Sequence, residues 1–146
     1  SMYKRVISNY PQSEHTVEAK MAMAKLYANH LGQPREAADI YLSIPEQYPS
    51  ADSASAIAYR EAGDIYAGTI RDYYRALETY LEYAIRFPHH QDVPDRLMKA
   101  AEITEKQYHD PDMTVNILNV IIDRYPESTE AKRADRRLAR YIGDTW

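Results

Sequence analysis

The chain has 146 residues, of which 45% are hydrophobic and 27% charged, proportions typical of one folded domain and not of a disordered chain. It contains no cysteine, which excludes disulfides, thiolate metal sites and thiol nucleophiles. A formal net charge of -4 disfavours a nucleic-acid partner, and no apolar run approaches the roughly 20 residues that cross a bilayer, so we expect no membrane contact by this segment.

An aromatic residue followed by proline recurs along the whole chain. The four dipeptides are Tyr10-Pro11, Tyr48-Pro49, Phe87-Pro88 and Tyr125-Pro126, and successive prolines lie 38, 39 and 38 residues apart. A period of this length predicts an array of stacked helical units, because each unit is too small to bury its apolar face alone. No residue type required for chemistry recurs with the period, so the pattern favours a binding surface over an active site.

The first predicted elements are the tail of a truncated helix at residues 3–10 and a longer helix that begins after Ser13 and runs to about His30. Residues 31–34 then predict a turn, since they contain a glycine suited to a left-handed backbone and a proline suited to the first position of a helix. A second helix follows at residues 34–48. Pro45 is expected to kink it or to end it near Ser43.

The same pair of helices is predicted twice more. A small polar residue suited to capping a first helix follows each dipeptide: Ser13, Asp52 or Ser53, Asp92 and Ser128. Second helices occupy residues 72–87 and 111–125, a final first helix covers 128–142, and the predicted count is about seven helices. The apolar rows of the three second helices match in register: Ala37, Tyr41 and Ile44; Ala76, Tyr80 and Tyr83; Thr114, Leu118 and Ile121. These rows are the predicted core.

The helices resemble the tetratricopeptide repeat, in which small and aromatic residues alternate at fixed places and a proline ends each unit. The residues that carry the resemblance are Ala62, Gly63, Tyr66, Ala76, Tyr80 and Pro88 in one unit and Ala24, Tyr27, Ala37, Tyr41 and Pro49 in the unit before it. The third unit departs from the pattern, with Glu102 and Glu105 where a small and an aromatic residue are expected.

The resemblance implies an all-α, right-handed solenoid of antiparallel helix pairs, in a single domain over residues 1–146. Its units would cover 11–49, 50–88 and 89–126, with a partial helix at each end. Since the chain enters a helix almost at once, we expect it to be a fragment of a larger protein. The long period is similar to that of bacterial envelope members such as the TolA-binding protein, which would imply the periplasm, although a cytoplasmic location stays open.

In the resembled fold, first helices line a concave groove, and the register of this chain projects eight basic residues onto that face against two acids. The projected residues are Glu18, Lys25, Asn29, Arg60, Asp64, Arg96, Lys99, Lys106, Gln107, Arg133, Arg136 and Arg140. A concave surface of one sign attracts a ligand of the other, so we expect a non-enzymatic module that binds an acidic peptide or a C-terminal carboxylate, with Asn29 and Gln107 on the peptide backbone. The alternative is that these are ordinary solvated helix faces.

Catalytic, metal and cofactor sites are not predicted. His89 and His90 stand beside Asp92, but neighbours in sequence point apart, whereas zinc requires three or four converging ligands. Glu102 and Glu105 share a helix face without the pocket that a general acid needs.

A structural role is the main alternative function. The end helices should expose Val6, Tyr10, Leu138 and Ile142, because terminal units lack a neighbour to cover them. They could stack on other copies to form a homo-oligomer, or the array could position an enzyme or membrane domain of a parent protein.

Overall fold

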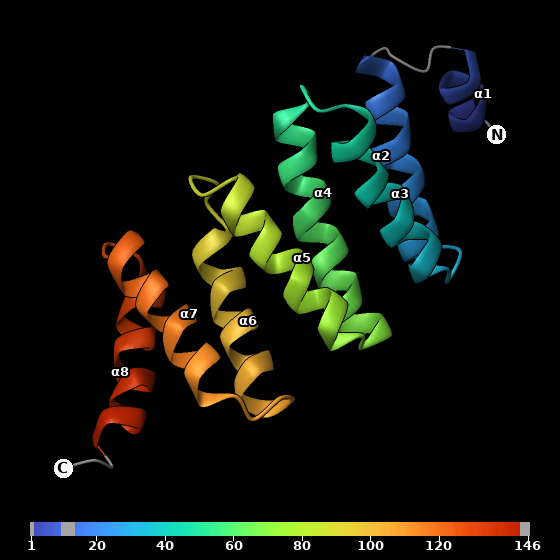
Figure 1. Ribbon diagram of the computed structural model, residues 1–146. Helices are drawn as coiled ribbons and strands as arrows, with labels where there is room; N and C mark the ends of the chain where they lie inside the picture. Colours follow the sequence, from blue (N-terminus) through green and yellow to red (C-terminus); the bar gives the residue numbers. More distant parts are fainter. Residues whose placement is uncertain (1, 10–13, 144–146) are drawn as a thin grey trace. The chain divides into compact units, whose positions relative to one another are not determined.

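The computed structural model describes residues 2–9 and 14–143, and all regular structure in them is helical. The all-α prediction is therefore confirmed. The described residues form eight α-helices, against the predicted count of about seven, and one π-helix. Their bounds are Met2–Asn9 (α1), Glu14–Asn29 (α2), Pro34–Gln47 (α3), Asp52–Asp64 (α4), Ile65–Ile70 (η1), Tyr73–Arg86 (α5), Val93–Lys106 (α6), Pro111–Arg124 (α7) and Thr129–Gly143 (α8) (Figure 1).

The helices pack in consecutive pairs within two compact units, Ser1–Thr79 and Tyr80–Trp146. In the first unit α1 packs on α2, α2 on α3, and α3 on α4 and η1. In the second unit α6 packs on α7, and α8 packs on both. The boundary falls within α5, and each unit is described below by itself.

The three rows predicted as core are buried. Every one of the nine side chains is at most 5% exposed, among them Tyr41, Tyr80 and Leu118 at equivalent positions. The tyrosine of the last aromatic–proline dipeptide also forms a hydrogen bond, since the Tyr125 hydroxyl donates to the backbone carbonyl of Pro88 at 2.7 Å. In the second unit this hydrogen bond joins two consecutive aromatic–proline dipeptides.

The turns between first and second helices share one geometry. In each turn a left-handed residue precedes the second helix, and a backbone N–H reaches back six residues to a carbonyl at the end of the first helix. The left-handed residues are Gly32 (φ 60), Arg71 (φ 62) and His109 (φ 50), and the hydrogen bonds are Gln33 to Tyr27 at 3.0 Å, Asp72 to Tyr66 at 2.9 Å and Asp110 to Thr104 at 2.9 Å. The repeat in sequence is thus a repeat of backbone structure.

Side-chain caps fix several helix starts. Asp72 accepts from the Arg75 N–H at 3.1 Å, and Asp110 accepts from the Met113 N–H at 3.0 Å. The predicted cap Ser128 accepts from the Ala131 N–H at 3.1 Å.

The other predicted helix starts differ in detail. Asp92 is the N-cap of α6 without a capping bond from its side chain. At the start of α4 the N-cap is Ala51, and Asp52 is already helical, so the predicted cap there is wrong by one residue. Ser13 lies outside the described residues.

Two helices deviate from the prediction. Helix α3 does not end near Ser43 but continues through Pro45 to Gln47, because the Tyr48 N–H donates to the Ile44 carbonyl at 2.8 Å and closes the last turn. After Asp64 the backbone widens into the π-helix η1, which no sequence signal indicated.

A buried lysine joins α2 to α3 in the first unit. The Lys20 ammonium donates to Ser43 Oγ at 3.1 Å and to Gln47 Oε1 at 2.5 Å, and it lies 5.6 Å from the centre of the Tyr48 ring. Burial lowers the pKa of Lys20. Its acceptors are neutral, so this contact positions the two helices by hydrogen bonding and not by ion pairing.

A polar cluster anchors α8 in the second unit. Glu105 of α6 accepts from Arg137 at 2.6 Å and from the Tyr141 hydroxyl at 2.5 Å. Burial alone would raise the pKa of Glu105, but these hydrogen bonds and the charges of Arg137 and Arg140 outweigh it and lower the pKa. Between α6 and α7, the hydroxyls of Thr104 and Thr114 bond at 2.7 Å.

We predict that Glu105→Gln destabilises the protein by about 1 to 3 kcal/mol at neutral pH, because it removes the charge from two hydrogen bonds. A lowered carboxyl pKa contributes stability above the ordinary value near 4.3, and this stability is lost as the pH falls through the folded-state value. Urea titrations at several pH values should therefore show that the variant loses less stability on acidification than the unaltered protein. Glu102→Gln on the same helix is the matched control and should change neither the stability at neutral pH nor the loss of stability on acidification. Equal behaviour of the two variants would contradict the cluster's role.

Gly32→Ala is predicted to cost about 1 to 2 kcal/mol, the strain of an L-residue in the left-handed region. Steric clash does not contribute, because a Cβ built at Gly32 meets no heavy atom within 4 Å. Gly68→Ala is the matched control, since its Cβ is equally unobstructed but its backbone is helical, and it should raise stability by up to about 1 kcal/mol. Urea midpoints that shift in the same direction for both variants would refute this explanation.

Candidate partner-binding pocket

The first unit contains a pocket of about 350 Å³. The residues that line it come from α2, α3, α4 and η1. Its lining residues are Met21, Ala22, Lys25, Ala28, Asn29, Tyr41, Ile57, Arg60, Glu61 and Ile65. Five of these side chains are apolar, and the other five are two cations, one carboxylate, one amide and one phenol. A pocket that combines apolar area with a few polar groups can both bury and orient a ligand.

Helical spacing explains why these residues converge. On α2, Met21, Lys25 and Ala28 recur at intervals of four and three residues, which places them on one face. On α4 and its π-helical continuation, Ile57, Glu61 and Ile65 recur at intervals of four and likewise share a face. The ring of Tyr41 from α3 also lines the pocket.

The two cations of the pocket differ in their surroundings. Arg60 donates to Glu61 at 3.0 Å, with side chains 22% and 37% exposed, so its charge is already balanced. Lys25 is exposed and forms no ion pair within the described residues. Burial raises the pKa of Tyr41, the Glu61 charge raises it further, and Arg60 opposes both. The pocket therefore holds one uncompensated positive charge.

Among the residues projected onto the groove, Lys25, Asn29 and Arg60 are brought together in this pocket. Asp64 and Glu18 do not line it, and Glu18 lies exposed with its carboxylate 3.8 Å from His15 Nδ1.

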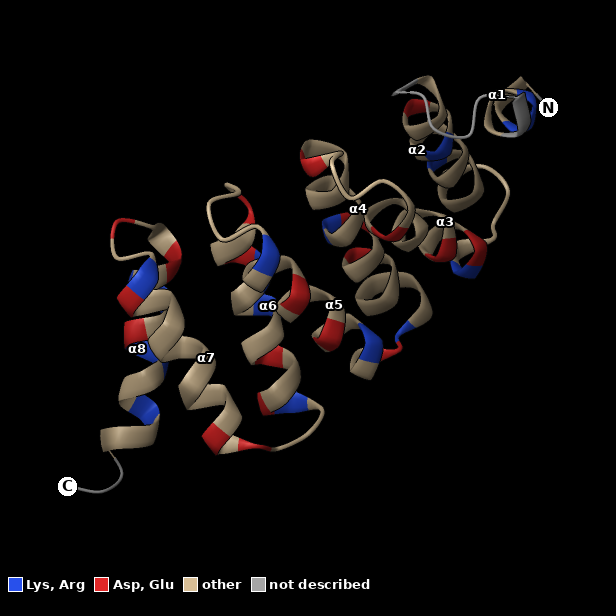
Figure 2. Cartoon of the chain, turned by 45° about the horizontal axis from the view of Figure 1, so that its top comes forward, with Lys and Arg blue, Asp and Glu red and all other residues tan. Residues whose placement is uncertain are grey.

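In the second unit the projected bases lie on α6 and α8. Arg96 pairs with Asp95 at 3.0 Å, and Lys99 lies 4.0 Å from the same carboxylate. The other projected residues of this unit are all exposed: Lys106, Gln107, Arg133, Arg136 and Arg140. Figure 2 shows basic and acidic bands alternating along α6 and α8. A single groove that continues through both units stays a prediction.

The projection missed the acids that balance its bases. Glu61 follows Arg60 and Asp95 precedes Arg96 in the sequence, and each carboxylate reaches its neighbour's guanidinium. A projection by register counts only the residues on one face, whereas long side chains reach around the helix. The signal that could have found these two pairs was the acid next to Arg60 and the acid next to Arg96 in the sequence.

The histidines form no metal site in the described part of the chain. There is no group of three or more His, Asp or Glu residues there that could hold a metal ion. His90 instead contacts the buried Tyr83, through a hydrogen bond between Nδ1 and the Tyr83 hydroxyl and an edge contact with 5.4 Å between ring centres. Over the same described residues, no helix has the length and apolar character needed to cross a membrane.

Comparison with known proteins gives a match to a family model. The family model of the tetratricopeptide repeat matches residues 18–51, a segment that contains most of α2 and all of α3. Repeats of this family generally mediate protein–protein interactions and are not catalytic. No curated protein and no solved structure matches the chain.

The electrostatics of the pocket predict opposite changes in the pKa of Tyr41. Glu61→Gln should lower this pKa, because it removes a negative charge that disfavours the phenolate, and Arg60→Gln should raise it. Titration of ring-labelled tyrosine by NMR would measure both. Shifts of the same sign in the two variants would show that the side chains are not arranged around Tyr41 as described.

Proposed function

We propose that the chain is a non-enzymatic interaction module whose first unit binds an acidic or carboxylate-ended peptide segment of a partner protein. The observation that carries this proposal is an exposed lysine without an ion pair, Lys25, which lines one pocket together with the amide of Asn29 and several apolar side chains. Lys25 would attract the ligand's carboxylate, and Asn29 would bond its backbone. The family match, which generally indicates protein binding, supports the same conclusion.

Apolar lining makes a purely acidic ligand a poor match. Met21 and Ile57, which are half-buried, offer apolar area that an apolar side chain can cover, and burial of such area supplies affinity at about 25 cal/mol per Å². The ligand should therefore combine a carboxylate with at least one large apolar residue. Glu61 further restricts the ligand, because its carboxylate would repel a second carboxylate of the ligand near Arg60.

The experiment measures binding of short labelled peptides of Glu and Leu by fluorescence anisotropy, with free or amidated C termini and with Lys in place of Glu as the control peptide. The Glu peptides should bind with an affinity that falls as salt rises, since exposed charges are screened over about 8 Å at physiological ionic strength. A preference for the free C terminus would identify a terminal carboxylate as the recognised group.

Lys25→Glu should abolish this binding while the urea midpoint stays nearly unchanged, because an exposed charge contributes about 0 to 1 kcal/mol to folding. Arg35→Glu, an identical reversal of sign at an exposed residue of α3 outside the pocket, is the matched control and should bind normally. Binding that survives Lys25→Glu, or that is lost equally in both variants, would reject the pocket as the site.

A further inference from the structure

Three residues of the first-unit pocket have equivalents in the second unit. Residues of α2, α4, η1 and α6 are matched by their distance from the left-handed residue of their own turn, and residues of α6 and α8 by the 38-residue period. Ala28, for example, lies four residues before Gly32, and Glu105 lies four residues before His109. The equivalent pairs are Ala28 and Glu105, Glu61 and Arg137, and Ile65 and Tyr141.

In the second unit these residues are bonded to one another. The Glu105 side chain reaches from α6 to α8, where its carboxylate accepts from Arg137 at 2.6 Å and from the Tyr141 hydroxyl at 2.5 Å. In the first unit an alanine stands at this place, and Ala28 lines the pocket together with Glu61. The pocket thus corresponds to the space that a glutamate side chain fills in the second unit.

The two units surround this space with different groups. The second unit places two donors, from an arginine and a tyrosine, around the Glu105 carboxylate. The first unit has an acid, Glu61, and an apolar residue, Ile65, at the same places. A ligand carboxylate beside Ala28 would find no donor in these two side chains and would be repelled by Glu61. The complementary group at this point of the ligand is therefore a base.

Glu61 has an oxygen available for such a base. Its Oε1 accepts from Arg60 at 3.0 Å, and Glu61 forms no other hydrogen bond with the residues that the structure describes. The Glu61 side chain is 37% exposed and lines the pocket. Since a carboxylate offers several acceptor sites, a second cation can share it with Arg60. Arg60 would partly repel that cation, so the gain in affinity should be modest.

We infer that the ligand carries an arginine close to its carboxylate, with the guanidinium bound to Glu61 beside Ala28 and the carboxylate bound to Lys25, a refinement that rests on the function proposed above. Lys25 and Ala28 lie three residues apart on α2, about 5 to 6 Å between Cβ atoms, so the acid and the base should be near neighbours in the ligand. Arginine fits better than lysine, because its planar guanidinium can donate edge-on to one carboxylate oxygen while its aliphatic stem contacts apolar side chains of the pocket.

The test repeats the anisotropy measurement with peptides of Glu and Leu in which one leucine at a time is replaced by arginine or by citrulline, its neutral analogue of the same shape. At a position near the carboxylate, the arginine peptide should bind about three- to fivefold more tightly than the citrulline peptide. Glu61→Gln keeps the side-chain length and removes the charge. It should abolish this difference and leave the requirement for Lys25 unchanged.

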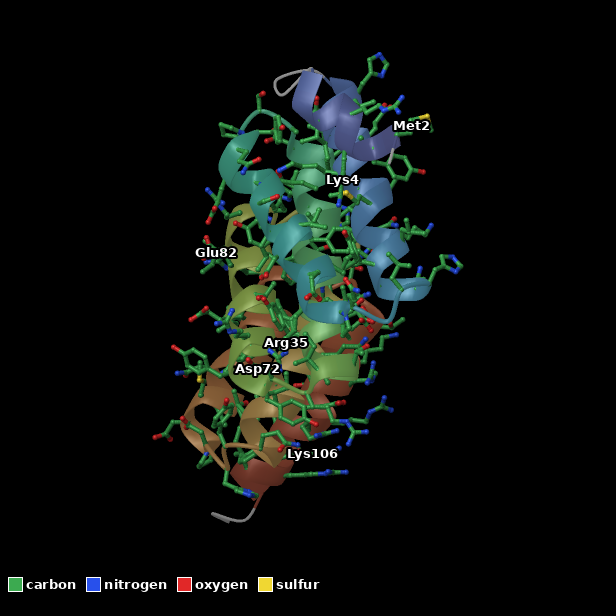
Figure 3. The ribbon with its side chains drawn as sticks, turned by 90° about the vertical axis from the view of Figure 1, so that its right-hand side faces the viewer. Met2, Lys4, Arg35, Asp72, Glu82 and Lys106 are labelled. Carbon is green, nitrogen blue, oxygen red and sulfur yellow. The ribbon has the colours of Figure 1, made fainter. Side chains whose placement is uncertain are left out.

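Glu82→Gln is the matched control for Glu61→Gln. The Glu82 side chain is exposed on α5 (Figure 3), pairs with Arg86 of the same helix at 3.6 Å and does not line the pocket. This variant should keep the preference for arginine. An equal loss of that preference in both variants, or a preference that survives Glu61→Gln, would reject Glu61 as the group that binds the base.

A second measurement tests the match between the two units without any ligand. Ala28→Glu places a carboxylate opposite Glu61 and should lower the urea midpoint. Adding Glu61→Arg should recover the midpoint, because the pair then reproduces the contact between Glu105 and Arg137. The double variant should therefore be more stable than the sum of the two single changes, and it should no longer bind peptide because its pocket is filled.

The outcomes separate this inference from the proposed function. Failure of every peptide to bind the unaltered chain would overturn both. Binding that depends on Lys25 but does not distinguish arginine from citrulline would overturn the inference alone, and so would a double variant whose two changes simply add.

Discussion

Burial of one residue row on each second helix is the constraint on which the rest of the structure depends. A pair of helices has too little interior to remove such a row from water, so each pair needs the next one to cover it. Tyr41, Tyr80 and Leu118 stand eight residues before their prolines and are all buried. The turns follow from the same constraint. Each second helix must return at the angle that brings its row inward, and a left-handed residue at a fixed place provides that return.

The regular part of the fold could be predicted from the sequence because it depends on spacing. Helix order, the buried rows and the cap at Ser128 were predicted from residue types that recur at a nearly constant interval. The features that could not be predicted depend on energies that nearly cancel. Pro45 is tolerated because only the last turn of α3 lies beyond it, and the π-helix after Asp64 differs from an α-helix by a small widening of the backbone.

The sequence predicted where the candidate site lies better than it predicted the charge of that site. Register placed Lys25, Asn29 and Arg60 together, and the structure brings all three to one pocket. It did not reveal that Arg60 is balanced by Glu61, because that pairing depends on side-chain rotamers and not on the helix face. Tyr41 was recognised as a core residue, yet the same ring also lines the pocket. In a helical array, the same residue can both pack in the core and line a pocket.

The shared turn geometry has a consequence for how such a chain can change in length. From the left-handed residue to the proline of the next aromatic–proline dipeptide the distance is 17 residues in all three repeats, from Gly32, Arg71 and His109 alike. From the proline of the preceding dipeptide to that residue it is 21, 22 and 21 residues, so the 39-residue repeat carries its extra residue before the turn. The one difference in length among the three repeats therefore lies in the first helix or in the loop before it. The segment from the turn to the end of the second helix keeps one length, so the buried rows stand at the same place in every repeat.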